Sequence, residues 1–358
     1  MNILTLGCDS FISKNLLSYT IRNNDLKIFN YTSLNQFRKY LSQINLIIIC
    51  SKKNKDKKKN CLNFIQEITK EIKKKKNLIP IIFLSDYSQK NYLNLKLNQD
   101  ENNLLDLHKL NKNPITIIRL PMIFGKFFKK NYSPLMDIIS QKNIDKNINI
   151  LEKIRKEKIV YIEDLIKLII KEIYFLKKGF KIRFPKPIYS YSLKDIYNKI
   201  FLYDQNFSTT KCFNVGSGFE RALYSSFLSY KSPKNFKKKI NSHQDQRGEF
   251  FELLKTKNSG QFSFFTIEPN KTRGQHYHNT KFEKFLVVNG KVEFKFKHIL
   301  KKKIFKILCN EKKMEIVNSI PGWIHSLKNI GKRKAQVFVW SNEVFNVKKP
   351  DTIFKKIK

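Results

Sequence analysis

The chain has 358 residues, a length typical of about two domains rather than one. Hydrophobic residues make up 41% of the sequence and aromatic residues 13%, which excludes a chain that is disordered throughout. Lys and Arg total 71 against 29 Asp and Glu, and this excess gives a formal net charge of +42 that raises the question of nucleic-acid or anionic-membrane binding.

The positive charge is spread along the whole sequence. Lysine runs occur at 55–59, 73–76 and 301–303, and no cluster of Arg or of basic residues interleaved with aromatics stands out. We interpret the charge as a compositional bias that would still attract an anionic substrate. We therefore expect neither nucleic acid nor membrane as a partner, and a basic nucleic-acid-binding protein is kept as the second alternative.

The N-terminus and the cysteines narrow the class of protein further. The first residues do not follow the pattern of a secretory signal, and no apolar stretch reaches the roughly 18 residues of a membrane span. The five cysteines are widely spaced and form no CxxC pair. We expect a cytoplasmic protein whose cysteines are reduced thiols.

The first two thirds of the chain predict alternating strands and helices. Helical spacing is found over Phe11–Thr20 and in Lys-rich amphipathic segments such as Cys61–Ile72. Apolar runs that we expect to form strands lie at Asn2–Leu6, Leu26–Phe29, Asn45–Cys50, Leu78–Leu84 and Ile115–Leu120. This alternation predicts a parallel sheet covered by helices, and its start, a strand that ends at Gly7 before a helix, is typical of a Rossmann unit.

A possible catalytic pair follows the fourth of these strands. The sequence YLNLK places Tyr92 and Lys96 four residues apart, a spacing that puts both on one face of a helix. The ammonium of Lys96 would then lower the pKa of the Tyr92 phenol, which could transfer the proton that accompanies hydride transfer. An ordinary pair of helical residues is the alternative interpretation of this spacing taken alone.

The order of these elements resembles the extended short-chain dehydrogenase/reductases that act on nucleotide sugars. The resemblance implies that Tyr92 and Lys96 act with a serine, which would be Ser85 or, as the alternative, Ser88. The segment RLPMIFG, residues 119–125, is similar to the family segment that lies beside the nicotinamide and the sugar.

The resemblance also implies a cofactor site at the first turn. The residues that it assigns to cofactor binding are Gly7, Ser10, Phe11, Ile12 and Lys96. The family pattern in this loop is G-x-x-G-x-x-G, whereas this chain keeps Gly7 and has Ser10 and Ser13 in place of the other two glycines. The segment NYTS at 30–33 has neither an acidic residue nor an Arg, so it does not distinguish NADP from NAD.

The last third of the chain concentrates the scarce histidines. The stretch GQHYHNTKFEKFLVVNG, residues 274–290, places His276 and His278 on the same face of a strand, with Glu283 five residues later. The segment PGWIHSLKN, residues 321–329, adds His325. Three of the six histidines thus fall within two short motifs, which makes chance placement a poor explanation.

These two segments resemble the paired motifs of cupins, which are small β-barrels that bind metal ions. The resemblance implies four metal ligands, namely His276, His278, Glu283 and His325. Alternating apolar residues at 285–288 and 292–296 fit the strands of such a barrel. We expect Zn²⁺ by resemblance, while the ligand types alone also suit Mn, Fe and Ni.

A reductase-like domain followed by a cupin is a rare combination. With a linker around Ser229–Asn241, we expect an α/β Rossmann-like domain over 1–240 and an all-β cupin (jelly-roll barrel) over 241–358. Together with the segments LYSSFLSY, RGEFFELLKT and KPDTIF, this arrangement resembles the bifunctional enzymes of capsular polysaccharide and O-antigen synthesis. The family is that of the UDP-2-acetamido-2,6-dideoxy-beta-L-arabino-hexul-4-ose reductases, on the pathway to UDP-N-acetyl-L-fucosamine.

This family resemblance implies two reactions on a UDP-linked 4-keto-6-deoxy amino sugar. The cupin would epimerise carbon 3 of the UDP-4-keto-2-acetamido-2,6-dideoxy sugar. The first domain would then reduce the 4-ketone with NADPH, or with NADH as the alternative, to UDP-2-acetamido-2,6-dideoxy-L-talose. The resemblance further implies a homodimer.

Two questions stay open at the level of sequence. The loss of two glycines from the cofactor loop allows the alternative of an inactive reductase half, which would leave a cupin epimerase or a sugar-binding protein. The base that removes the proton from carbon 3 is also open, because Tyr277, Lys281 and Lys284 all neighbour the expected ligands.

Overall fold

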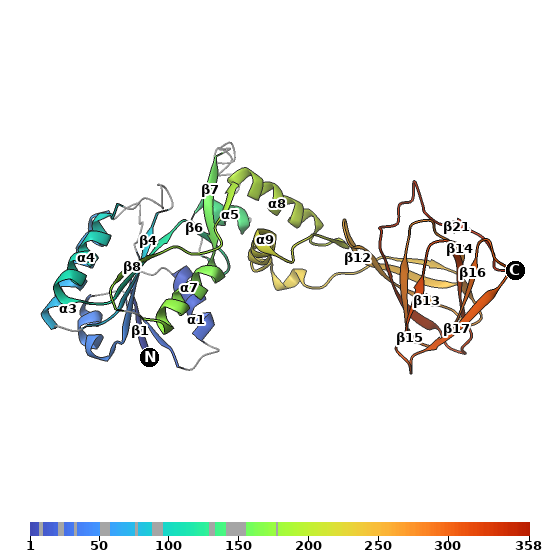
Figure 1. The fold of residues 1–358 in the computed structure, drawn as a ribbon, viewed down its shortest axis with the longest axis horizontal. Coiled ribbons are helices and arrows are strands. Elements are labelled where there is room, and N and C mark those ends of the chain that lie inside the picture. Colours follow the sequence, from blue (N-terminus) through green and yellow to red (C-terminus); the bar gives the residue numbers. More distant parts are fainter. Residues whose placement is uncertain are drawn as a thin grey trace. The chain divides into compact units, whose positions relative to one another are not determined.

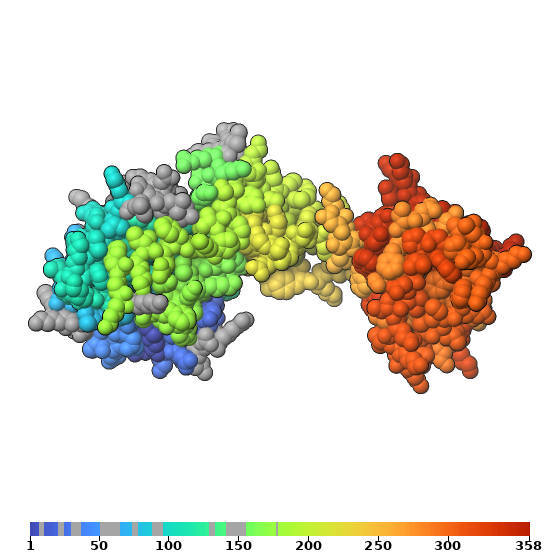
Figure 2. All heavy atoms as spheres, in the orientation of Figure 1, coloured from blue at the N-terminus to red at the C-terminus, as the bar shows by residue number. Residues whose placement is uncertain are grey.

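The chain divides into two compact units in the computed structural model. The first unit comprises Met1–Phe201 and Ser217–Lys231, and the second comprises Leu202–Gly216 and Ser232–Lys358 (Figure 1). The structure describes residues 1–6, 10–20, 25–31, 34–50, 58–75, 78–87, 96–128, 133–140, 155–176 and 178–358. The remaining residues, drawn in grey in Figure 2, all belong to the first unit. The predicted domain boundary between residues 240 and 241 stays a prediction.

A six-stranded parallel sheet forms the centre of the first unit. Its strand order is β2-β1-β3-β4-β5-β8, so the order reverses between β1 and β3. The strands are β1 (Asn2–Leu6), β2 (Lys27–Tyr31), β3 (Leu46–Cys50), β4 (Ile81–Asp86), β5 (Ile115–Leu120) and β8 (Phe180–Arg183). In sheets of this kind, ligands bind beyond the carboxyl ends of the strands at the point of reversal.

Helices cover both faces of this sheet. Alternate strand residues point to opposite faces, so Ile3 packs in one hydrophobic cluster and Leu4 in the other. The Ile3 cluster includes residues of α1 (Ser10–Thr20) and α7 (Ile162–Tyr174). The Leu4 cluster includes residues of α2 (Leu34–Tyr40), α3 (Lys58–Lys75) and α4 (Gln99–Asn111). Burial on both faces explains why the strands read as uninterrupted apolar runs.

The rest of the first unit lies after β5. A small sheet has the order β6-β7-β9, with β6 at Met122–Phe124, β7 at Lys156–Tyr161 and β9 at Tyr189–Ser192. Further helices among the described residues are α5 (Pro134–Ile139), α8 (Leu193–Asn206), whose last residues belong to the second unit, and α9 (Gly218–Leu228).

Cys50, the last residue of β3, is disulfide-bonded in this structure. The expectation of a reduced thiol is therefore wrong for Cys50. Cys212 and Cys309 are free, as expected.

Two antiparallel sheets form the second unit. One contains β11 (Ser242–Asp245) paired with β12 (Gly248–Thr256), and its path runs β10-β12-β13-β20-β15-β18. The other has the order β17-β16-β19-β14-β21. The further strands are β10 (Lys211–Cys212), β13 (Gly260–Ile267), β14 (Thr272–Tyr277), β15 (Glu283–Asn289), β16 (Lys291–His298), β17 (Ile304–Asn310), β18 (Ile316–Ser319), β19 (Trp323–Asn329), β20 (Ala335–Ser341) and β21 (Ile353–Phe354).

Residues from both sheets share one apolar core. Phe265, Phe285 and Val337 contribute to it from the first of these sheets, and Phe294 and Leu327 from the second. This packing confirms the expected fold class, an α/β Rossmann-like domain with a cupin-like barrel after it. No helix within the described residues is long and apolar enough to cross a membrane.

Candidate metal centre and cofactor region

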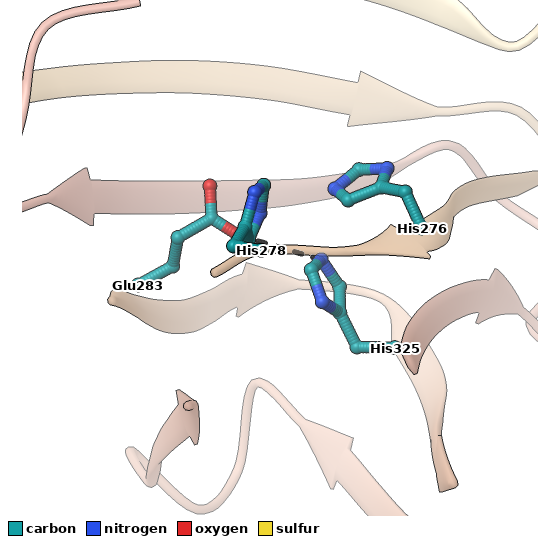
Figure 3. Close-up of side chains that lie close together, drawn as sticks. All are labelled: His276, His278, Glu283 and His325. Carbon is teal, nitrogen blue, oxygen red and sulfur yellow. Dashed lines mark hydrogen bonds and ion pairs between the residues drawn. The ribbon is translucent and has the colours of Figure 1, made fainter. Parts of the chain in front are cut away.

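Three strands of the second unit bring together the four predicted metal ligands. His276 lies in β14, His278 directly follows that strand, Glu283 begins β15, and His325 lies in β19. The register of β14 and β19 places His276 opposite His325. Figure 3 shows the four side chains converging on one another. The predicted ligand positions thus meet in space, although they come from segments about 40 residues apart.

The ligand atoms are close enough to share one ion. One donor atom from each of the four residues lies within 4.8 Å of all the others. The Nε2 atoms of His278 and His325 are 3.2 Å and 3.3 Å from the same Glu283 carboxylate oxygen. Three imidazoles and one carboxylate form a donor set that suits Zn²⁺ and other divalent transition metals.

Hydrogen bonds to residues outside the ligand set orient two of the imidazoles. The Nδ1 of His325 lies 2.8 Å from the Ser319 hydroxyl oxygen, and the Nδ1 of His278 is hydrogen-bonded to the backbone oxygen of Asp351. With Nδ1 engaged in this way, Nε2 is left to bind a metal. Neither Ser319 nor Asp351 was predicted as a site residue: Ser319 lies six residues before His325 but outside the expected motifs, and Asp351 lies 73 residues after His278.

Burial favours the neutral, metal-binding form of two of the histidines. Burial lowers the pKa of His276 to about 4 and that of His325 to about 3, so both rings are neutral at pH 7. Burial alone would raise the pKa of Glu283, but the contact with His278 and the electrostatic effect of the neighbouring imidazoles hold it below its usual range. An ionised carboxylate beside neutral imidazoles fits a divalent cation.

A local irregularity in β14 places His276. Gly274 has a φ of +84°, and a Cβ at that position would lie 2.8 Å from the His325 backbone oxygen. Gln275 has a φ of +64°, which is uncommon for a residue with a side chain, and the register of β14 against β19 shifts between Gly274 and His276. This bulge redirects the strand just before the first ligand.

A cavity of about 200 Å³ opens onto the metal centre. His276, Glu283 and His325 line it, together with the cationic side chains of Arg247 and Arg273. Its apolar walls are Phe250, Phe265, Phe285, Leu327, Val339 and Phe354, and Gly274 and Thr352 complete its lining. The cavity therefore combines ligand positions for a metal with a positively charged flank.

The two arginines are held differently. Arg247 is paired with Asp245 through hydrogen bonds from its guanidinium. Arg273 donates from Nε to the Thr266 backbone oxygen at 2.9 Å, whereas its Nη2 is buried and makes no hydrogen bond. The Nη2 of Arg273 is 3.7 Å from an Asp245 oxygen, which is an ion pair too long for a hydrogen bond. Arg273 thus keeps a buried donor beside the cavity.

The three residues considered as the base differ in their surroundings. Lys284 donates to the Asn318 side-chain oxygen at 3.1 Å, and the buried Lys281 lies over the Phe345 ring. Tyr277 is paired across β14 and β21 with Ile353. Within the second unit, which is described throughout, none of the three lines the cavity. The assignment of the base therefore stays open.

Of the predicted reductase residues, the structure describes Ser85, in the last part of β4, and Lys96, which precedes α4. Ser85 is completely buried in β4, and its hydroxyl accepts a hydrogen bond from the Asn98 side chain at 3.1 Å. Lys96 lies in a bend three residues before α4, and the helix face that it would share with Tyr92 stays a prediction. Tyr92 and Ser88 lie outside the described residues, and the catalytic roles stay predictions.

The start of α1 carries the predicted cofactor-binding residues. Ser10 is the first helical residue, and Phe11 and Ile12 are buried in the core, so only their backbone could face a bound phosphate. Ser13, which replaces the last glycine of the family pattern, is also buried. A helix that starts beyond a parallel strand fits a dinucleotide phosphate. Gly7 lies outside the described residues.

The segment RLPMIFG is held by contacts that the sequence did not predict. Arg119 forms a completely buried ion pair with Glu101, at 2.8 Å between Nη2 and Oε2. The Tyr230 hydroxyl donates to the Gly125 backbone oxygen at 2.6 Å. The pattern of Asn98 followed three residues later by Glu101 is a capping-box signature that could have located Glu101.

The fold and the site define a Rossmann-like domain followed by a cupin-like barrel with a cluster of three histidines and one glutamate that could hold a metal ion. The comparisons with known proteins agree with this class. The chain is 31% identical over 363 residues to the UDP-2-acetamido-2,6-beta-L-arabino-hexul-4-ose reductase of Pseudomonas aeruginosa, covering 98% of each protein. It belongs to this family of reductases. Residues 243–353 match the family model described as the polysaccharide biosynthesis C-terminal domain.

Solved structures extend the similarity to the whole fold. The capsular polysaccharide assembling protein CapF from Staphylococcus aureus matches with a TM-score of 0.86 and 25% identity, covering 99% of this chain and 100% of that one. A second crystal form of CapF matches with a TM-score of 0.80 and 27% identity over the same shares. The chain is therefore of the CapF type in both halves.

Proposed function

We propose that this protein is a bifunctional nucleotide-sugar enzyme. Its second unit epimerises carbon 3 of a UDP-4-keto-2-acetamido-2,6-dideoxy sugar, and its first unit reduces the 4-ketone with NADPH to UDP-2-acetamido-2,6-dideoxy-L-talose. The observation that carries this proposal is the cluster of His276, His278, Glu283 and His325 in a cavity, in a chain related along its whole length to a 4-ulose reductase.

The chemistry of the cavity supports epimerisation next to a ketone. A ketone acidifies the hydrogen on the adjacent carbon, and a bound divalent cation supplies Lewis-acid stabilisation to the enolate that forms. Ser319 and the Asp351 backbone keep the imidazoles of His325 and His278 oriented for that ion. We propose Zn²⁺ as the ion, because three nitrogens and one carboxylate suit it.

The charged flank of the cavity supports a substrate with a diphosphate. Arg247 and Arg273 both line the cavity, and the buried Nη2 of Arg273 has no hydrogen-bond partner. Guanidinium groups bind phosphate oxygens through charge-assisted hydrogen bonds. A UDP-sugar would satisfy the unpaired donor while its sugar reaches the metal centre.

The proposed reduction uses the residues assigned by resemblance. NADPH supplies the hydride. Tyr92 would give a proton to the oxygen of the 4-ketone, and Lys96 would keep the pKa of that phenol near the working pH. Ser85 would donate its hydroxyl proton to the sugar while its oxygen keeps the hydrogen bond that it accepts from the Asn98 side chain.

Two assays in parallel test the two activities. In D₂O without NADPH, the wild type should exchange the hydrogen on carbon 3, and His276→Ala should lose most of this exchange. With NADPH, the wild type should oxidise the cofactor and give the talose product, as read by NMR. Full exchange by His276→Ala, with an unchanged product, would reject the role of the metal centre.

A cupin epimerase with an inactive reductase half is the second candidate. The observations that favour it are the buried Ser13 in place of a glycine and the position of Lys96 outside any helix. This candidate predicts exchange at carbon 3 with no oxidation of NADPH or NADH. Cofactor oxidation that depends on the 4-keto sugar would exclude it.

A further inference from the structure

The segment 350–358 runs alongside the strand that carries the first metal ligand. Within it, β21 pairs antiparallel with β14, so that Phe354 lies opposite His276 and Ile353 opposite Tyr277. The Phe354 ring stands edge-on to the His276 ring, with 6.0 Å between their centroids. The segment therefore forms one flank of the metal centre.

The carboxylate of Asp351 holds the loop that follows His278. Its oxygens accept hydrogen bonds from the backbone N–H groups of Asn279, Thr280 and Lys281, at 2.7 to 3.1 Å. The Thr280 hydroxyl donates to it as well, at 2.9 Å. Although burial alone would raise the pKa of Asp351, these donors hold it well below the usual range. The carboxylate is thus a fixed anchor for residues 279–281.

The backbone of the same residue holds the metal ligand itself. The Nδ1 of His278 is hydrogen-bonded to the Asp351 carbonyl oxygen, which can accept only if Nδ1 carries the proton. The Nε2 of His278 then faces the Glu283 carboxylate, at 3.2 Å. One residue thereby sets both the tautomer of His278 and the course of the chain after it.

The end of the segment contacts the strained residue before His276. The backbone oxygen of Gln275 accepts a hydrogen bond from the Lys355 N–H, and its side-chain oxygen accepts one from the Ile357 N–H, both at 2.9 Å. Gln275 is the residue of β14 with a φ of +64°. A conformation of this kind persists where surrounding contacts determine it.

We propose that the segment 350–358 is a clamp that fixes the position of β14, the strand that carries His276. We also propose that Asp351 is a positioning residue for the metal ion. The segment contacts β14 at Gln275, before His276, and contacts residues 278–281, which follow the strand. Groups that orient metal-bound histidines commonly change metal affinity about 10–100-fold when removed. The inference rests on the metal centre of the proposed function and is separable from the epimerase activity.

The test measures metal affinity in the full chain without substrate. Asp351→Asn keeps the size of the side chain but replaces an acceptor that serves three N–H groups with an amide that also carries donors. We expect its dissociation constant for Zn²⁺, measured by competition with a chromophoric chelator, to rise about 10–100-fold. The absorption spectrum of the Co²⁺-loaded protein should change as well, because the position of His278 is less defined.

Asn329→Ala is the matched control for loss of stability. Asn329 is completely buried in the same unit and donates to the backbone oxygens of Ile267 and Arg333, both at 2.8 Å, away from the metal ligands. The Asn329→Ala variant should have a lower melting temperature than the wild type and an unchanged affinity for Zn²⁺. An equal loss of affinity in Asn329→Ala and Asp351→Asn would overturn the positioning role.

A shortened chain that ends at Phe354 tests the clamp independently, should Asp351→Asn fail to fold. It keeps Asp351 but lacks the two hydrogen bonds to Gln275, and we expect a smaller but measurable loss of affinity. Unchanged Zn²⁺ binding in both variants would overturn the clamp alone. A wild-type protein that binds no divalent ion would instead overturn the metal centre of the proposed function.

Discussion

Glu101 and Arg119 are opposite charges with no exposed surface. The guanidinium of Arg119 donates to both carboxylate oxygens of Glu101, at 3.0 Å from Nε and 2.8 Å from Nη2. The Tyr87 hydroxyl donates to the same carboxylate at 3.0 Å. Because removal from water is costly for both ions, each depends on the other for its stability in the interior.

Glu101→Gln should therefore destabilise the first unit strongly. The variant leaves the Arg119 charge buried without a counter-charge, which commonly costs about 3–5 kcal/mol. Chemical denaturation, followed by circular dichroism, measures the difference. Glu163→Gln is the control, because the pair of Glu163 and Lys126 is partly exposed and should contribute less than about 1 kcal/mol. Equal effects of the two variants would contradict this prediction.

At the scale of single residues, sequence reasoning found the metal ligands because rare residue types recur at a strand spacing. It did not find Asp351, although the segment KPDTIF had been singled out, because the contact joins residues more than 70 positions apart. The pairing of Tyr92 with Lys96 stays a prediction, because Tyr92 lies outside the described residues and Lys96 itself lies in a bend. Spacing predicts a shared face only where the secondary structure is known.

At the scale of elements, β14 and β19 show how a glycine fixes a site. Gly274 lets the backbone of β14 approach the His325 carbonyl, where a Cβ would lie at 2.8 Å. Gly322 has a similar φ of +77°, but no atom lies within 4 Å of its Cβ position. Substitution of Gly322 therefore tests the cost of the backbone conformation alone, whereas substitution of Gly274 adds the cost of a steric clash.

Gly322→Ala should cost about 1–2 kcal/mol, the ordinary penalty of a left-handed conformation. Gly274→Ala should add roughly 1–3 kcal/mol for the clash and should also weaken Zn²⁺ binding, because β14 must move away from His325. Thermal unfolding and chelator competition measure the two effects. Retention of wild-type affinity by Gly274→Ala would show that the strand relaxes without displacing His276.

The strands and helices themselves were largely predictable from the sequence. The apolar runs of the first unit are strands because a parallel sheet is buried on both faces, as at Ile47 and Ile48. Which strands pair with one another was harder to predict from the sequence, since pairing depends on contacts between residues that are far apart in the chain. The bulge at Gln275 has no local signature, because its conformation is fixed by residues 355 and 357.

At the scale of the whole molecule, two compact units predict two unfolding transitions. A metal that binds one folded unit stabilises that unit alone, by about 4 kcal/mol when its free concentration is 1,000-fold above the dissociation constant. We expect a chelator to lower the melting temperature of the second unit and to leave that of the first unchanged. Differential scanning calorimetry with and without chelator measures this, and an equal shift of both transitions would contradict it.

The homodimer that the family resemblance implies is a second prediction about the whole molecule. An aromatic outer face on the sheet of β12, β13 and β20 supports it, because this face lies opposite the apolar core. Its members include Phe251, Phe262, Phe264, Phe338 and Trp340, and the Phe262 and Phe338 rings stack at 5.3 Å. A face of this kind is a candidate for burial against a second copy.

Light scattering after size exclusion tests this prediction. The wild type should have the mass of two chains, and Phe338→Glu should shift it towards one, because a charge is costly in an apolar interface. Leu300→Glu, at a residue that is 85% exposed and outside this face, is the control. A wild type that is a monomer throughout the micromolar range would exclude the dimer.

The short strand β10 has a practical consequence for isolating the barrel. It belongs to the second unit although it precedes α9, and it pairs with Lys255 and Thr256 at the end of β12. A protease that cuts once near residue 235 should therefore leave two fragments that stay associated through β10. A recombinant barrel starting at residue 241 would keep the pairing of β12 with β13 but expose the edge that β10 covers, which would be open to association with other chains.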